Sequence, residues 1–217
     1  VKSGVSIVGY TGTGANGTVG HGLSSAPEAI FMKSRTRNEN WAVYHKFDGG
    51  TDGRSFLNLN TTGAKFDNGP NSYFQDTPPT NSVFYQNGST YNVASATYIA
   101  YCFHSVDGFS KIGKYIGNAS TDGPFVHCGF RPAWILTKNT ASGSDWAIYD
   151  NKRLGYNVDN NIMRIGQSSA PTEQTDDDID ILSNGFKFRR SSSNFNNAQL
   201  FVFLAFAEQP FKYANAR

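Results

Sequence analysis

Three glycines near the N-terminus have the spacing of a dinucleotide-binding loop. Gly12, Gly14 and Gly17 form a G-x-G-x-x-G pattern after the apolar run at residues 5–10. In a Rossmann fold, the helix that follows such glycines presents its N–H groups to the cofactor pyrophosphate. Here further glycines and Pro27 follow, and no amphipathic helix begins. The sequence therefore predicts no cofactor, and a hairpin loop between two strands.

An acidic run could bind a hard cation such as calcium. The segment "TDDDIDIL" at residues 175–182 offers Asp176, Asp178 and Asp180 as carboxylate ligands. The EF-hand pattern needs a glycine at loop position six and a glutamate at position twelve, and neither is present. We expect a solvated loop before the strand at Asn184, with a metal site as the weaker alternative.

Catalytic motifs are missing from the sequence. There is no H-E-x-x-H, no pair of histidines at the i, i+4 spacing of a helical metal site, and no G-x-S-x-G nucleophile elbow. We therefore predict no catalytic residues, and surface or hydrogen-bonded positions for the histidines, which are His21, His45, His104 and His127. The lone cysteines Cys102 and Cys128 do not form a disulfide framework, and Cys102 reads as a small buried residue.

Two polar loops carry aromatic rings. The segment "PNSYFQDTPP" contains Tyr73, Phe74 and Asp76, and "KRLGYNVDNN" contains Tyr156, Asn157 and Asp159. Tyrosine offers rigid contact area and asparagine adaptable hydrogen bonds, a mixture that suits the recognition of glycans or proteins. These six residues are the predicted ligand-binding residues. The alternative, that the rings cap the ends of a sandwich, stays open.

The polar–tryptophan pairs Asn40–Trp41 and Asp145–Trp146 are a further candidate for sugar binding, because an indole ring can stack on a pyranose. Side chains alternate between the two faces of a strand. Trp41 is two residues from Val43, and Trp146 is two residues from Ile148. We therefore expect both tryptophans to face the core.

The chain is an internal repeat. The segments "PEAIFMKSRTRNENWAVYH" and "PAWILTKNTASGSDWAIYD" share a proline, a lysine, a tryptophan and a tyrosine, each pair 105 positions apart. The segments at residues 81–103 and 184–206 match at an offset of 103. In the second copy, Ala119 and Asp122 stand where Gly14 and Gly17 stand in the first, which argues further against a shared phosphate loop.

Composition and spacing predict an all-β fold. Aromatic residues make up 14% of the chain and charged residues 17%, and short β-branched and aromatic runs alternate with turn formers. Six strands per unit predict an antiparallel β-sandwich of the jelly-roll or lectin type. We expect two homologous units of about 105 residues, at residues 1–108 and 109–217, packed into one assembly with pseudo-two-fold symmetry.

Charge and hydropathy exclude other classes of protein. Nineteen basic residues face seventeen acidic ones, and the basic residues form no block, so we expect no nucleic-acid partner. No apolar run reaches the length of a transmembrane helix, and we expect no membrane insertion. The chain lacks an initiator methionine and a signal peptide, and is expected to be a processed or excised piece of a longer protein.

The sequence resembles a family of uncharacterised repeat domains in the structural proteins of tailed bacteriophages, especially marine phages. The resemblance rests on "GYTGTGANGTVGHGLSSAPEAIFMKSR", "VDGFSKIGKYIGNASTDGPFV", "LSNGFK" and "AFAEQPFKYANAR", and covers nearly the whole chain. It implies a virion module, towards the end of a tail fibre, that contacts the host surface. It implies no catalytic residues.

Together these observations predict a non-enzymatic receptor-binding domain of a phage tail fibre. Its expected partners are a host surface glycan or protein and other virion proteins. The fibre analogy adds an expected homotrimer, which would gain avidity from several weak sites. The first alternative is a purely structural virion component, in capsid decoration or fibre-tip assembly. The second is a glycan depolymerase, which would need two carboxylates about 5–10 Å apart.

Overall fold

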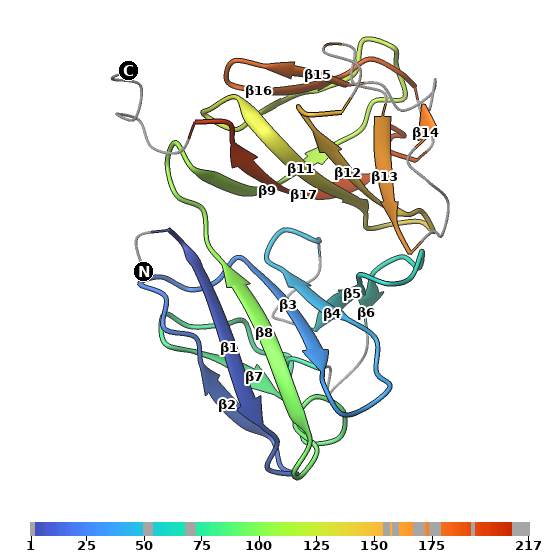
Figure 1. The fold of residues 1–217 in the computed structure, drawn as a ribbon. Coiled ribbons are helices and arrows are strands. Elements are labelled where there is room, and N and C mark those ends of the chain that lie inside the picture. The colour runs from blue at the N-terminus through green and yellow to red at the C-terminus, as the bar shows by residue number, and fades with distance from the viewer. Residues whose placement is uncertain are drawn as a thin grey trace. The chain divides into compact units, whose positions relative to one another are not determined.

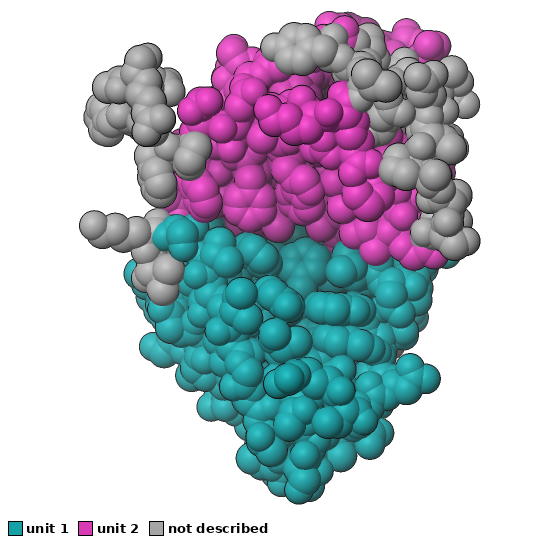
Figure 2. Space-filling model, viewed as in Figure 1, with its two compact units in different colours: residues 1–104 teal, residues 105–217 magenta. Residues whose placement is uncertain are grey.

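The structure is a computed structural model that describes residues 3–49, 54–67, 73–153, 157, 161–166, 172–173, 179–191 and 194–209. All regular structure in these ranges is β-strand, and the strands pair antiparallel, so the prediction of an all-β sandwich is confirmed. None of the described residues form a helix long and apolar enough to cross a membrane. The chain divides into two compact units, Val1–His104 and Ser105–Arg217 (Figure 2).

Unit 1 is a two-layered structure with one large and one small sheet (Figure 1). The large sheet has the strand order β1 (Val5–Thr11), β8 (Thr97–Phe103), β3 (Ala29–Ser34), β4 (Ala42–His45), β5 (Ser55–Asn58) and β6 (Phe66–Asp67). The small sheet pairs β2 (Gly17–Gly20) with β7 (Val83–Gln86).

Unit 2 repeats this strand order. Its large sheet runs β9 (Ser110–Ile116), β17 (Leu200–Ala207), β11 (Pro132–Asn139), β12 (Trp146–Asp150), β13 (Asn161–Ile165) and β14 (Thr172–Glu173). Its small sheet runs β10 (Phe125–His127), β16 (Gly185–Phe188) and β15 (Ile179–Leu182). The order matches that of unit 1 strand for strand, with β15 added.

The core of each unit lies between its two sheets and is rich in aromatic rings. In β8, alternate residues are buried, and Tyr98, Ala100 and Cys102 face the core that also contains Phe84 of β7. In unit 2, the ring of Tyr115 stacks on Phe201 at 4.8 Å between centroids. Such pairs contribute roughly 0.5–1.5 kcal/mol each beyond the burial of their area.

The loop of Gly12 and Gly14 joins the two layers. Strands β1 and β2 belong to different sheets, so the prediction of a hairpin is wrong and the loop is a crossover. The N–H of Gly12 donates to the carbonyl of Ala96 at 2.8 Å, and that of Gly14 to the carbonyl of Asn92 at 2.7 Å. Both N–H groups are therefore used to hold the loop against its own unit.

The expected orientation of the two tryptophans is also wrong. The core clusters take Ala42 and Tyr44 from β4, and Ala147 and Tyr149 from β12. Because neighbouring side chains point to opposite faces of a strand, the tryptophans preceding these residues lie on the other face. Trp146 is nevertheless buried, at 1% exposed, while the partly exposed indole of Trp41 packs against Tyr101 at 6.2 Å.

Both cysteines are free and buried, as expected for Cys102, and they should make stability depend on pH. Burial raises the pKa of Cys102 and of Cys128 from 9.0 to about 12. The folded state therefore holds both protons more tightly than the unfolded chain. This contribution is complete below pH 9 and is lost as the pH rises from 9 to 12. We expect the Tm to fall across this window, and less steeply in a Cys102→Ala/Cys128→Ala variant. Thermal denaturation on both sides of pH 9 checks this, and equal slopes would contradict it.

Candidate functional site

The first predicted binding loop forms a turn beside the small sheet of unit 1. Phe74 is 1% exposed and packs edge-on against Tyr44 at 5.6 Å, so its ring belongs to the core. Tyr73 and Asp76 are partly exposed, and Asp76 has a left-handed backbone with φ 53°. The carbonyl of Tyr73 accepts a hydrogen bond from the N–H of Asn87 at 3.1 Å, which ties the turn to the end of β7.

The second predicted loop is only partly described. Tyr156 and Asp159 lie outside the described residues. Asn157 is exposed, and its Oδ1 accepts a hydrogen bond from the N–H of Ile181 at 3.0 Å. This amide therefore supports strand β15, and a ligand site on the loop stays a prediction.

The acidic run is described at one of its three candidate ligands. Asp176 and Asp178 lie outside the described residues. Asp180 lies on β15, is 8% exposed, and forms an ion pair with Arg189. Among the described residues, no three histidine, cysteine or carboxylate side chains gather closely enough to hold a metal ion.

The histidines of unit 1 that are most buried are hydrogen-bonded, as expected. His21 is 1% exposed; its Nε2 lies 3.0 Å from the carbonyl of Thr80, and its Nδ1 accepts from the N–H of Leu23. The Nδ1 of His45 accepts from the N–H of Phe47 at 3.2 Å. Both imidazoles therefore stabilise backbone turns by hydrogen bonds.

A row of four aromatic rings runs from the surface of unit 1 into its core. Phe66 is 40% exposed and stacks on Phe56 across strands β5 and β6, with 5.1 Å between ring centroids. Phe56 contacts Tyr73 at 4.1 Å, and Tyr73 contacts the fully buried Tyr91 at 4.7 Å. We call Phe66, Phe56, Tyr73 and Tyr91 the aromatic row. The ring of Tyr73 therefore lies between two other aromatic rings, which its neighbours in the sequence do not indicate.

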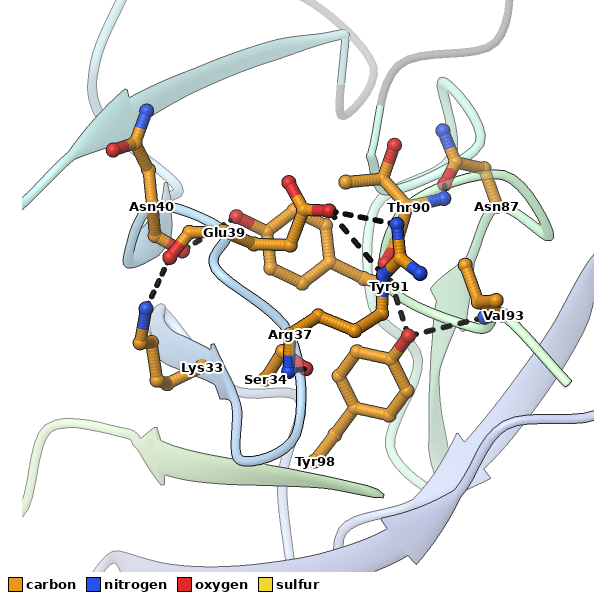
Figure 3. Close-up of polar contacts among 10 residues, drawn as sticks. All are labelled: Lys33, Ser34, Arg37, Glu39, Asn40, Asn87, Thr90, Tyr91, Val93 and Tyr98. Atoms are coloured by element: carbon orange, nitrogen blue, oxygen red, sulfur yellow. Dashed lines mark hydrogen bonds and ion pairs between the residues drawn. The ribbon is translucent and has the colours of Figure 1, made fainter. Parts of the chain in front are cut away.

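The inner end of the aromatic row is joined to the loop between β3 and β4. The hydroxyl of Tyr91 donates to the carbonyl of Asn40 at 2.7 Å (Figure 3). Within this loop Arg37 pairs with the carboxylate of Glu39 at 3.2 Å, and Lys33 of β3 donates to the Glu39 carbonyl. Three contacts therefore anchor the short polar loop beside the aromatic row.

Two exposed amides extend the polar loop towards β5. The side chain of Asn60 donates to Oδ1 of Asn40 at 2.9 Å, and its own Oδ1 accepts from the N–H of Trp41 at 2.9 Å. Both asparagines are exposed. We call the aromatic row together with Arg37, Glu39, Asn40 and Asn60 the aromatic–polar site.

The phenols of this site hold their protons more tightly than a free tyrosine does, and that of Tyr91 donates a hydrogen bond. Burial raises the pKa of Tyr73 and of Tyr91, and the negative charge of Glu39 raises both further. Glu39 immediately precedes Asn40, whose carbonyl accepts the hydrogen bond of Tyr91. The site thus combines a carboxylate, a guanidinium, two amides and an exposed ring, and these groups can accept and donate hydrogen bonds and offer an apolar face.

The corresponding end of unit 2 keeps the lysine contact, and its described residues differ in chemistry from those of the aromatic–polar site. Lys138, which matches Lys33 at the repeat offset, donates to the carbonyl of Ser144 at 2.5 Å. Tyr115 donates to the carbonyl of Phe195 at 2.9 Å, as Tyr10 does to the carbonyl of Tyr91. Phe195 therefore takes the place of Tyr91, and the guanidinium of Arg164 lies over its ring at 5.8 Å. The two ends are chemically different.

Sequence patterns missed most of this site. Asn40 was singled out for its neighbour Trp41, and Tyr73 for its loop, whereas Arg37, Glu39, Asn60 and Phe66 carried no signal of their own. An alignment of the two copies gives such a signal, because Glu39 and Asn40 align with Ser144 and Asp145 at the repeat offset. A change of chemistry between two copies of one loop marks a position where the copies have diverged.

Fold and site together define an all-β protein of two topologically matched sandwich units, and unit 1 carries the aromatic–polar site. The chain belongs to the family described as "Domain of unknown function (DUF7483)", whose model matches residues 1–210. No curated protein matches it. Among solved structures, the major capsid protein P2 from bacteriophage PM2 is similar at 10% identity, with 95% of this chain and 100% of that chain covered. Its TM-score of 0.26 is too low to carry an argument about fold or function.

Proposed function

We propose that this protein is a non-catalytic recognition module of a phage virion, and that it binds a host surface glycan through the aromatic–polar site of unit 1. The observation that carries this proposal is a series of ring contacts. The exposed ring of Phe66 stacks on Phe56, which contacts Tyr73, and Tyr73 contacts Tyr91, whose hydroxyl holds the polar loop together with Lys33. The virion setting rests on the resemblance of the sequence to phage repeat domains.

The chemistry of the site suits a sugar. The C–H face of a pyranose is apolar and packs against an aromatic ring, whereas its hydroxyl groups need both donors and acceptors. Phe66 supplies the ring, Glu39 accepts hydrogen bonds, and Arg37, Asn40 and Asn60 can donate them. Because the loop is already held by its backbone contacts, little conformational entropy is lost when a ligand binds.

Removing the exposed ring should weaken glycan binding. We expect Phe66→Ala to reduce the affinity of the protein for a bound bacterial surface polysaccharide about tenfold or more, equivalent to about 1.4 kcal/mol. The measurement is binding of labelled protein to host cells and to their purified polysaccharide, before and after periodate oxidation of the sugar diols.

Phe125→Ala is the matched control, because Phe125 of unit 2 is 44% exposed and lies outside the site. An equal loss of affinity in both variants would contradict the assignment of the site. Folded protein that binds no cell or polysaccharide would favour the alternative of a structural virion component. Release of reducing ends from the polysaccharide would favour a depolymerase.

A further inference from the structure

Strand β1 forms a seven-residue edge of the large sheet in unit 1. It pairs with β8 along its whole length, from Val5 opposite Phe103 to Thr11 opposite Thr97. Among the described residues, no strand pairs with its other side, and Figure 1 shows it as the last strand of the sheet beside β8. Such an edge presents a row of backbone donors and acceptors.

The hydrogen bonds that flank β1 determine which residues carry these outward groups. The N–H of His104 donates to the carbonyl of Gly4, and the N–H of Gly12 donates to the carbonyl of Ala96. Bonded and non-bonded pairs alternate along an antiparallel ladder. The even positions of β1 therefore bond to β8, and the outward backbone groups belong to Val5, Ile7, Gly9 and Thr11.

The matching edge of unit 2 is protected, whereas β1 is not. Strand β9 carries two exposed lysines, Lys111 and Lys114, and lysine on an edge strand opposes pairing with another chain. Strand β1 has no charged residue and no proline. It presents Ile7, which is 62% exposed. The edge strand of unit 2 therefore carries charges that oppose pairing, whereas the equivalent strand of unit 1 carries none.

We infer that β1 pairs antiparallel with β1 of a second copy of this chain, about a two-fold axis at Val8. In this register the outward groups of Ile7 meet those of Gly9 of the second copy, and those of Val5 meet those of Thr11. Directly opposed residues project side chains on the same face. Ile7 thus packs over the space left by a glycine, and no like charges meet.

This pairing closes on itself. A two-fold interface uses the same patch on both subunits. A β1–β1 pair therefore occupies the β1 edge of each copy, and assembly through this edge ends at a dimer. The two six-stranded sheets become one continuous sheet. The inference is independent of glycan binding, because β1 contributes no residue to the aromatic–polar site.

The test is the mass of the full 217-residue protein in solution. Sedimentation equilibrium over a concentration series is expected to show a monomer–dimer equilibrium. Ile7→Lys places two ammonium groups at the interface and should raise the dimer dissociation constant about tenfold or more. Ile116→Lys is the matched control, because Ile116 is 67% exposed at the end of β9, and it should leave the constant unchanged.

Amide hydrogen exchange adds a residue-level readout that does not depend on a variant. Ser6, Val8 and Tyr10 should be protected in monomer and dimer alike, whereas Ile7 and Gly9 should gain protection only as the dimer forms. A monomer at every concentration, a mass of three chains, equal effects of the two lysine variants, or no added protection at Ile7 and Gly9 would each overturn the inference.

Discussion

Gly12→Ala is expected to destabilise unit 1 by about 3 kcal/mol, because there is no room for a methyl group at this position. A Cβ on Gly12 would lie 2.0 Å from the carbonyl oxygen of Val93 and 2.8 Å from the carbonyl carbon of Asn92. Both are backbone atoms. The segment cannot move aside cheaply, since Gly12 donates to Ala96 and accepts from the N–H of Ser95.

The measurement is urea denaturation followed by the amide resonances of each unit, because two units need not unfold in one transition. Gly20→Ala is the control: the nearest atom to its Cβ would be the carbonyl oxygen of Ser82 at 3.9 Å. Gly117→Ala should repeat the effect in unit 2, where the Cβ would lie 1.9 Å from the carbonyl oxygen of Asn197. Equal stability of Gly12→Ala and Gly20→Ala would show that the crossover loop tolerates a side chain.

Gln86→Leu is expected to raise the stability of unit 1 by about 1–3 kcal/mol, because it removes a buried amide that lacks hydrogen bonds. Gln86 is fully buried on β7, two residues after Phe84 and on the same face. In the part of the chain that the structure describes, neither its Nε2 nor its Oε1 has a hydrogen-bond partner. In unit 2, Phe188 follows the core residue Phe186 by the same step and is apolar.

Gln75 provides a control, for which the same substitution should change the stability in the opposite direction. Gln75 donates from Nε2 to the carbonyl of Gly17 at 2.8 Å and to that of Gln86 at 2.6 Å. Gln75→Leu should therefore destabilise unit 1, by about 1–3 kcal/mol. Urea midpoints of the two variants are compared with that of the parent protein. A destabilised Gln86→Leu variant would mean that the Gln86 amide is satisfied in solution.

A comparison of the two copies by sequence predicts the core residues of some strands and not of others. At an offset of 103, Tyr98 and Ala100 match Phe201 and Phe203, and all four face the cores. The same offset places Phe84 opposite Lys187, although in unit 2 the core residues are the neighbours of Lys187. A shift of one residue moves a strand's side chains to the other face. The copies are therefore in register at β8 and β17 and out of register at β7 and β16.

The pairing of β1 could not be predicted from local signals either. Two strands separated by a short glycine loop predicted a hairpin, because that is the usual connection of neighbouring antiparallel strands. The first strand instead pairs with β8, far along the chain, and the second with β7. Crossing between layers lets one face of each sheet contribute to a single core, and this gain depends on residues outside the loop.

The sequence by itself determined the all-β class, the internal repeat and the recurrence of Lys33 and Lys138, because strand alternation, turn residues and the repeat are local or periodic. Only the tertiary structure decided which side chains form the aromatic–polar site. Glu39, Phe66, Tyr73 and Tyr91 come from different segments of unit 1. Their approach depends on sheet order and on the contacts of loops, and neither leaves a pattern along the chain.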